Sequence, residues 1–263
     1  MISDYFPEIK GLILDMDGVL WHDSQPLGDL PFIFDRIRYF GYEFILVTNN
    51  ATRTVKEYQE KLAGFGVFLE ANQIINTSEA VGSLLHQRYP DGANLFVIGQ
   101  PSLKQTLESY GMKIVDDASS NVEVVIGSLD YDLTYEKLKH ASLLIQSGCK
   151  FIGTNPDKTL PTPEGFIPGS GTVISALEVA SGVKAEIVGK PEPLLFQIAL
   201  ERLALNPQDT LAIGDRLETD IAGAQAANIH SALVLSGASS QEEAQKFHPQ
   251  PDIIAQNLTE LVG

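Results

Sequence analysis

Short apolar runs that alternate with helix-forming segments are the feature that most limits the fold of this chain. Residues 11–14 and 44–48 read as strands buried on both faces, and residues 29–40 between them carry apolar side chains at helical spacing. A further strand is expected at 74–77. The same order returns near the end, with expected strands at 187–188, 210–213, 230–235 and 252–254 and expected helices at 193–203 and 219–227. This alternation predicts an α/β fold with a doubly wound, Rossmann-like parallel sheet.

The middle of the sequence repeats the alternation and predicts a second, smaller α/β domain. Its expected strands are 95–98, 122–126 and 150–152, and its expected helices are 102–110 and 135–146. We therefore expect a core of residues 1–82 and 185–263, with residues 83–184 inserted between its two parts. The Pro- and Gly-rich segment 162–171 predicts a surface loop.

Charge and cysteine content limit the partners of the chain. It carries 34 acidic and 18 basic residues, a formal charge of −16, so neither nucleic acid nor an anionic membrane is an expected partner. A phosphorylated substrate would also be repelled unless a metal ion and a lysine supplied local positive charge. The single Cys149 allows no internal disulfide, and the N-terminus has neither a basic region nor a long apolar run. We expect no signal peptide, no membrane segment and a cytoplasmic location.

Polar residues that could carry chemistry directly follow four of the expected strands. They are Asp15 and Asp17, Thr48 and Asn49, Lys190, and Asp215 with Asp220. The carboxyl ends of parallel strands meet at one edge of a sheet, where ligands bind. Each segment alone has an ordinary alternative: an Asp-Gly turn, a helix-entry turn, a solvated lysine or an acidic helix cap. Together they gather carboxylates that would repel each other without a hard cation such as Mg²⁺.

The order of the segments DMDGVL, VTNN, GKPEP and GDRLETD resembles the haloacid dehalogenase (HAD) superfamily of phosphatases. The resemblance extends from Leu12 to about Leu261 and is greatest with subfamily IIA, which includes 4-nitrophenyl phosphatases, phosphoglycolate phosphatases and nucleotide phosphatases. It implies a Mg²⁺-dependent hydrolase of small phosphorylated metabolites. The inserted domain would be the family's cap, and members of the family often form homodimers through it.

The resemblance also implies a role for each carboxylate. Asp15 would be the nucleophile and a Mg²⁺ ligand. Asp17 would be the general acid/base, with its backbone carbonyl on the metal. Asp215 would be a further metal ligand, and Asp220 would orient metal-bound water and Lys190.

The remaining core residues would handle the phosphoryl group. Thr48 and Asn49 would bind it, and Lys190 would neutralise both the phosphate and Asp15. Asp15 would then form an aspartyl-phosphate that water cleaves, with Asp17 moving the protons.

The segment 153–160 matches the cap's substrate loop, which makes Asn155 and Asp157 the candidates for substrate specificity. An Asn-Pro-Asp turn is the alternative interpretation. Leu160 stands where members that favour pyridoxal phosphate carry a histidine, and this disfavours that substrate.

Two other functions compete with the phosphatase. A phosphomutase of the same superfamily would need a bisphosphate activator and usually a different cap. A phosphorylatable, receiver-like regulatory module would also use strand-end Asp, Thr and Lys with Mg²⁺, although such modules are much shorter. Trp21, close to Asp15 and Asp17, is expected to pack in the interior, with the site entrance as the alternative.

Overall fold

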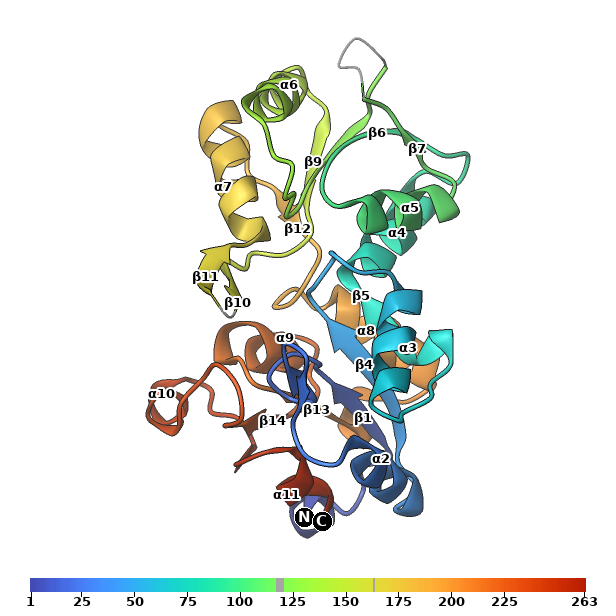
Figure 1. Cartoon of the computed structure of the whole chain (residues 1–263), viewed down its shortest axis with the longest axis vertical. Helices are drawn as coiled ribbons and strands as arrows, with labels where there is room; N and C mark the ends of the chain where they lie inside the picture. Colours follow the sequence, from blue (N-terminus) through green and yellow to red (C-terminus); the bar gives the residue numbers. More distant parts are fainter. Residues whose placement is uncertain (117–120, 163) are drawn as a thin grey trace. The chain divides into compact units, whose positions relative to one another are not determined.

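The computed structural model describes residues 1–116, 121–162 and 164–263 (Figure 1). The chain forms two compact units. The first unit comprises Met1–Thr48, Val55–Ile75 and Lys190–Gly263, and the second comprises Asn49–Thr54 and Asn76–Gly189.

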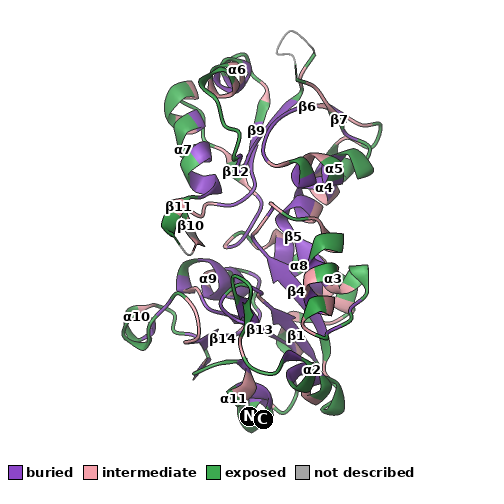
Figure 2. Ribbon diagram, viewed as in Figure 1, coloured by how far each residue is buried: buried purple, intermediate pink, exposed green. Residues whose placement is uncertain are grey.

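The first unit is built on a six-stranded sheet in the order β15-β14-β13-β1-β4-β5. Every pair from β15 to β4 is parallel, which confirms the predicted doubly wound sheet. The strands are β1 Gly11–Leu14, β4 Glu43–Thr48, β5 Ile74–Asn76, β13 Thr210–Gly214, β14 His230–Val234 and β15 Ile253–Ala255. Because both faces are covered, β1 and β13 are buried along their whole length (Figure 2).

Helices connect and cover these strands. They are α1 Ile2–Tyr5, α2 Leu30–Tyr39, α3 Val55–Gly64, α8 Leu194–Leu203, α9 Ala222–Ala226, α10 Gln241–Lys246 and α11 Leu258–Val262, with the short helical turns η1 Ala71–Gln73, η2 Pro207–Asp209 and η3 Leu217–Ile221. Helix α2 starts where expected because the Asp29 carboxylate accepts a hydrogen bond from Phe32 N at 3.2 Å, which caps its first turn. A small hairpin, β2 Trp21–His22 and β3 Gln25–Pro26, follows β1.

The second unit has its own five-stranded parallel sheet, in the order β12-β9-β8-β6-β7. The strands are β6 Asn94–Ile98, β7 Lys113–Ile114, β8 Val124–Gly127, β9 Lys150–Gly153 and β12 Glu186–Ile187. The helices are α4 Thr77–Arg88, α5 Pro101–Ser109, α6 Tyr135–Gln146 and α7 Ser170–Ser181, and β10 Thr159–Thr162 forms a hairpin with β11 Gly165–Pro168. In the described ranges of both units, no helix is long and apolar enough to cross a membrane.

The strand expected at 187–188 was assigned to the wrong sheet. As β12 it pairs with β9, through Glu186 opposite Ile152 and Ile187 opposite Gly153, and so belongs to the second unit. A strand of two residues carries too little pattern to select its partner. That choice depends on residues far away in the sequence.

The segment 162–171 is also not a loop, apart from residue 163, which lies outside the described residues. It contains β11 and the first turn of α7. Its glycines serve close packing: a Cβ on Gly171 would lie 2.3 Å from the carbonyl oxygen of Pro156, while Gly171 N donates to the Asp157 carbonyl at 2.9 Å. Because Gly171 has no side chain, the start of α7 can lie close to the backbone of Pro156 and Asp157.

Helix α4, which the sequence reading did not anticipate, lies in the second unit because it packs on α5. The ring of Tyr110, just after α5, covers Gly82, and Tyr110 Oη donates to the Glu79 carboxylate at 3.1 Å. The longer of the two segments of the second unit therefore runs from Asn76 to Gly189, and the expected insertion of 83–184 lies within it. The role of that insertion as a cap stays a prediction.

Gly82→Ala should destabilise the protein, because the new Cβ would lie 2.4 Å from the Tyr110 ring. We expect a loss of about 1–3 kcal/mol in the free energy of unfolding, typical of overpacking. The matched control is Gly64→Ala at the end of α3, where nothing lies within 4 Å of the added carbon. Urea unfolding should show Gly64→Ala at or above wild-type stability, and equal stability of the two variants would contradict this packing.

Candidate active site

Three neighbouring strands place the first group of predicted residues at one edge of the six-stranded sheet. Asp15 directly follows β1, Thr48 is the last residue of β4, and Asp215 directly follows β13. Because β4, β1 and β13 are adjacent and parallel, their carboxyl ends lie together. Gly18 completes the turn after Asp15 with a φ of +83°, and a Cβ there would lie 2.3 Å from Asp215 Oδ2. The Asp-Gly turn thus allows the two strand ends to approach closely.

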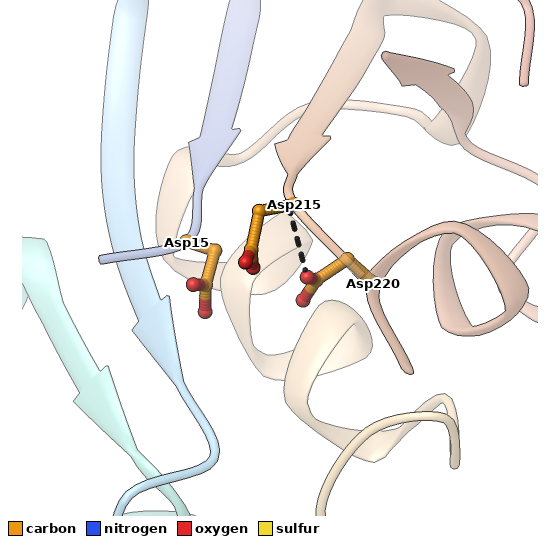
Figure 3. A group of neighbouring side chains, drawn as sticks. All are labelled: Asp15, Asp215 and Asp220. Atoms are coloured by element: carbon orange, nitrogen blue, oxygen red, sulfur yellow. Dashed lines mark hydrogen bonds between the residues drawn. The ribbon is translucent and has the colours of Figure 1, made fainter. Parts of the chain in front are cut away.

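Asp15, Asp215 and Asp220 form a cluster of carboxylates (Figure 3). One oxygen from each lies within 4.8 Å of the others. Asp215 and Asp220 are buried, and only 11% of the Asp15 side chain is exposed. Three carboxylates this close and this poorly hydrated repel each other strongly unless positive charge is supplied.

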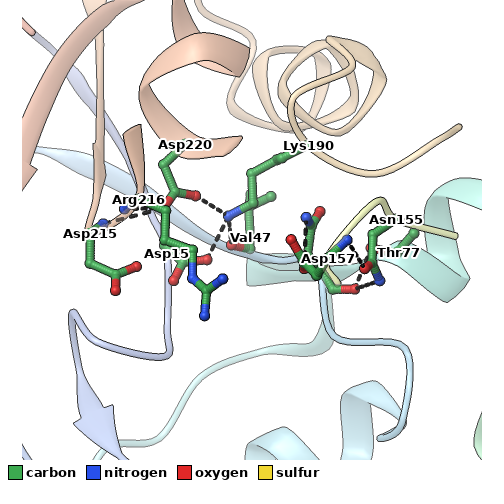
Figure 4. Close-up of polar contacts among 10 residues, drawn as sticks. Asp15, Val47, Thr77, Asn155, Asp157, Lys190, Asp215, Arg216 and Asp220 are labelled. Atoms are coloured by element: carbon green, nitrogen blue, oxygen red, sulfur yellow. Dashed lines mark hydrogen bonds and ion pairs between the residues drawn. The ribbon is translucent and has the colours of Figure 1, made fainter. Parts of the chain in front are cut away.

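Lys190 supplies part of that charge. Its Nζ donates to Asp15 Oδ1 at 2.5 Å, to Asp220 Oδ1 at 2.6 Å and to the Val47 carbonyl at 3.2 Å (Figure 4). Burial alone would lower the pKa of Lys190, but Asp15 and Asp220 raise it above its ordinary value, so the ammonium stays charged. With the side chain 3% exposed, Lys190 is no solvated surface lysine.

Asp220 is held against the protein by both of its oxygens. Its Oδ1 accepts from Lys190, and its Oδ2 accepts from the backbone N–H groups of Asp215 at 3.2 Å and Arg216 at 3.0 Å. The π-helical turn η3 produces this arrangement, because it returns the side chain of residue 220 to the turn that follows β13. Asp220 is therefore suited to orient its neighbours rather than to bind a ligand directly.

Two oxygens of the cluster remain available. Asp215 Oδ2 accepts from Ala238 N at 2.7 Å, and Asp15 Oδ1 accepts from Lys190. Within the described ranges, no hydrogen bond is formed to Asp15 Oδ2 or Asp215 Oδ1. This pair of carboxylate oxygens fits a hard divalent cation, with Asp220 behind it.

The pKa values of Asp15 and Asp215 are both raised, because burial and the neighbouring carboxylates disfavour the ionised form. Burial raises the pKa of Asp15 well above its usual range, against the opposing effect of Lys190. Burial, together with the charge of Asp220, raises the pKa of Asp215 to about 7. A bound cation would favour the ionised carboxylates and relieve both penalties.

Asp17 stands apart from the cluster. It is exposed, and its Oδ1 accepts a hydrogen bond from the indole Nε1 of Trp21 at 2.8 Å. Trp21 itself is completely buried, so it packs in the interior as expected and does not line an entrance.

The second unit brings together Asn49, Asn155 and Asp157. Asn155 is buried; its Nδ2 donates to the Asn49 carbonyl at 2.8 Å and to Ser170 Oγ at 3.3 Å, and its Oδ1 accepts from Asp157 N at 3.1 Å. Asn49 Nδ2 in turn donates to Asp157 Oδ2 at 3.3 Å, and Thr77 Oγ1 donates to the Asn49 carbonyl at 2.9 Å (Figure 4). The Asn155 amide thus holds the backbone at Asn49 and at Asp157.

Comparison with known proteins agrees with this geometry. Residues 12–113 match the haloacid dehalogenase-like hydrolase family and residues 187–261 match the HAD-hydrolase-like family. The acid sugar phosphatase of Staphylococcus saprophyticus is 30% identical over 253 residues, 96% of each chain. The 5'-nucleotidase YutF of Bacillus subtilis is also 30% identical, over 96% of this chain and 97% of its own. The structure of a 4-nitrophenylphosphatase from Thermotoga maritima superposes with a TM-score of 0.90 at 32% identity, over 97% of each chain.

The chain belongs to the haloacid dehalogenase-like hydrolase family. Its similarity to 4-nitrophenylphosphatase and acid sugar phosphatase places it among the HAD phosphatases of subfamily IIA, as the motifs predicted. The enzyme class is thereby confirmed, while the roles of individual site residues remain proposals.

Sequence reasoning missed one supporting element of this HAD phosphatase, the loop 236–239 after β14. Ala238 N bonds the Asp215 carboxylate, Ser239 Oγ accepts from Leu217 N at 3.1 Å, and Ser236 Oγ donates to the Gly18 carbonyl at 2.7 Å. The loop follows a strand that ends at the same sheet edge, and this position is the sequence feature that could have predicted its role. Its small residues carry no charge, so nothing in their chemistry distinguished them.

Asp215→Asn should stabilise the metal-free phosphatase at alkaline pH. The folded pKa of Asp215, about 7, lies above the ordinary value of 3.8, so its contribution to stability is present below about pH 4 and is lost as pH rises through 7. Removing the charge should raise the free energy of unfolding at pH 8 by roughly 1–3 kcal/mol. Each kcal/mol corresponds to a rise of about 2–4 °C in the melting temperature.

The measurement is thermal unfolding in EDTA at pH 5 and pH 8, with Asp35→Asn on the surface as the control. The advantage of Asp215→Asn should shrink at pH 5. Added Mg²⁺ should stabilise the wild type more than the variant. A variant that follows the wild-type pH dependence would rule out the buried charge as its cause.

Proposed function

We propose that this HAD phosphatase hydrolyses phosphate monoesters of small metabolites through an aspartyl-phosphate on Asp15, with Mg²⁺ as its cofactor. The observation that carries the proposal is the buried cluster of Asp15, Asp215 and Asp220 with Lys190 bonded to two of its members. Such a group suits phosphoryl transfer, in which positioning and charge stabilisation provide most of the catalysis.

The donor set favours Mg²⁺. Asp15 and Asp215 each offer a carboxylate oxygen, and the family resemblance adds the backbone carbonyl of Asp17. Oxygen ligands of this kind, completed by water and substrate phosphate, are those that Mg²⁺ prefers. When bound, the ion would offset negative charge on the carboxylates and on the phosphoryl oxygens.

The chemistry assigned to the residues has two steps. In the first, an oxygen of Asp15 bonds to phosphorus and the ester P–O bond breaks, while Asp17 gives its proton to the departing oxygen. In the second, Asp17 takes a proton from water, whose oxygen bonds to phosphorus and releases Asp15. Asp15 Oδ2 is assigned to the cation, which leaves Oδ1, held by Lys190 Nζ, as the attacking oxygen.

Other residues would complete the site. Thr48 and Asn49 are proposed to bind the phosphoryl group. Residues 83–184 are proposed to act as a cap that keeps bulk water from the reaction. The named relatives, an acid sugar phosphatase and a 5'-nucleotidase, differ in leaving group, so the phosphate monoester is the substrate chemistry that we carry over. A cytoplasmic location and a homodimer formed through the cap stay predictions.

Asp15→Asn should abolish turnover, because an amide is a poor nucleophile at phosphorus. We expect kcat to fall by at least about 10⁴-fold, as for removal of nucleophiles elsewhere. The assay is phosphate release from 4-nitrophenyl phosphate with Mg²⁺, and EDTA should abolish the wild-type activity as well. Asp35→Asn is the surface control. Near wild-type kcat in Asp15→Asn would reject the nucleophile, and full activity in EDTA would reject the metal.

Asp157→Ala and Asn155→Ala test whether each side chain recognises the substrate or supports the backbone of the second unit. Both were predicted as specificity residues, but only Asp157 is partly exposed, while Asn155 is bonded at both ends of its amide. Asp157→Ala should change kcat/KM unequally between substrates, by about 5- to 150-fold for a lost hydrogen bond of 1–3 kcal/mol. Asn155→Ala should instead lower the stability by about 1–3 kcal/mol, because it removes the bonds that the buried amide donates to the Asn49 carbonyl and accepts from Asp157 N.

The comparison uses kcat/KM for the best natural phosphate ester relative to that for 4-nitrophenyl phosphate, beside urea unfolding of each variant. An unchanged ratio in Asp157→Ala would place recognition elsewhere in the second unit. A changed ratio in Asn155→Ala without loss of stability would restore Asn155 as a specificity residue.

A further inference from the structure

The carboxylate of Asp17 has one strong constraint on its orientation. Asp17 is exposed, and in the described part of the chain the only hydrogen bond to its side chain comes from Trp21 Nε1 at 2.8 Å. The backbone reinforces this pairing, because Gly18 N donates to the Trp21 carbonyl at 2.8 Å and residues 17 and 21 form an isolated β-bridge. An exposed aspartate otherwise samples several rotamers, so this bond selects one of them.

The donor is itself held rigidly. Trp21 is completely buried, and its strand β2 pairs with β3 through Pro26. The Phe65 ring lies 6.0 Å from the indole, and Lys61 Nζ lies 4.0 Å from its centroid, within range of a cation–π interaction. Lys61 Nζ also donates to the Asp23 carbonyl at 2.7 Å, which ties the ring to the loop of the hairpin.

A buried indole N–H needs an acceptor, and backbone carbonyls are the usual ones. Here the acceptor is instead the exposed carboxylate of Asp17, a residue to which proton transfer is assigned. We infer that Trp21 is a positioning residue for this reaction: its N–H fixes Oδ1 of Asp17 and leaves Oδ2 to give the proton to the leaving oxygen and to take one from water. This inference deepens the proposed function and rests on the acid/base role of Asp17.

Loss of the Trp21 N–H should affect substrates unequally, whereas loss of packing alone should affect them alike. An alkoxide is a poor leaving group, so its oxygen must receive a proton as the P–O bond breaks. 4-Nitrophenolate is a good leaving group and needs little protonation. The parameter kcat/KM reports the steps up to transfer of the phosphoryl group to Asp15, so effects on the later hydrolysis do not enter. Loss of the N–H should therefore lower kcat/KM more for alkyl phosphates than for activated aryl phosphates.

The chain allows an unusually clean test, because Trp21 is its only tryptophan. Production in a tryptophan auxotroph can replace it with β-(3-benzothienyl)alanine, which keeps the ring shape but has sulfur in place of N–H. The matched control is 5-fluorotryptophan, which keeps the N–H. Trp21→Phe is the genetic counterpart, and thermal unfolding checks that each protein is folded. If Trp21→Phe does not fold, the near-isosteric benzothienyl protein still provides the answer.

The measurement is kcat/KM with saturating Mg²⁺ for a series of aryl phosphates of decreasing leaving-group acidity, extended to one alkyl phosphate. Removing a general acid outright costs about 10²- to 10⁴-fold, so its misplacement should cost about 10-fold or more on the alkyl ester and less than about 3-fold on 4-nitrophenyl phosphate. The 5-fluorotryptophan protein should follow the wild type across the series.

Asp17→Asn separates failure of this inference from failure of the proposed function. If Asp17→Asn steepens the dependence on leaving group and the benzothienyl protein does not, Trp21 serves packing alone and the inference is wrong. If Asp17→Asn leaves the dependence unchanged, Asp17 is not the acid, and the inference falls together with the acid/base role assigned to Asp17, while hydrolysis through Asp15 stands on its own test. Steepening in both proteins, smaller in the benzothienyl one, supports the inference.

Discussion

The ion pairs between buried Lys190 and the carboxylates of Asp15 and Asp220 are the interaction on which the rest of the site depends. A buried charge is tolerated only when it is paired and hydrogen-bonded, and Lys190 meets this condition with all three of its donors. The cluster nevertheless holds three carboxylates against one ammonium. The remaining negative charge makes the site receptive to a divalent cation, and this property links the fold to the proposed phosphoryl transfer.

The sheet makes this concentration of charge possible. Adjacent parallel strands deliver Asp15 and Asp215 to one edge, and the π-helical turn after β13 directs Asp220 back toward both of them. Backbone N–H groups then bind the oxygens that the lysine leaves, from Arg216 on Asp220 and from Ala238 on Asp215. Each carboxylate is thus held through at least one of its oxygens, and one oxygen from each lies within 4.8 Å of the others. Such pre-organisation lets the site act on a phosphoryl group without rearranging its charges.

Asp17 and Asn155 show how residues of one motif set differ in their surroundings. Asp17 stays exposed and, within the described residues, its side chain accepts one hydrogen bond, from Trp21 Nε1, which suits the acid/base role proposed for it. Asn155 is buried, with its amide bonded to Asn49 and Asp157. The same motif matching selected both residues as functional. Burial and hydrogen bonding distinguish a residue able to meet the substrate from one that holds the backbone in place.

The fold class and the enzyme family could be predicted from the amino-acid sequence alone. The apolar runs before Asp15, Thr48 and Asp215 are local patterns, so the strands and the polar residues that end them were readable without coordinates. The four motifs in their order were also sufficient for the family, which the comparisons confirm.

The partners of those residues could not be predicted from the sequence and are visible in the tertiary structure. It placed β12 in the second sheet, made a hairpin and a helix of the Pro- and Gly-rich segment, and brought Asn155 to Asn49 across 106 residues of sequence. It also showed which carboxylate oxygens accept no hydrogen bond within the described residues, and that Trp21 Nε1 donates to Asp17. The physical reason is that strand pairing, close backbone approach and hydrogen bonds between distant residues depend on geometry in space, whereas periodicity in a sequence reports only which side of an element is buried.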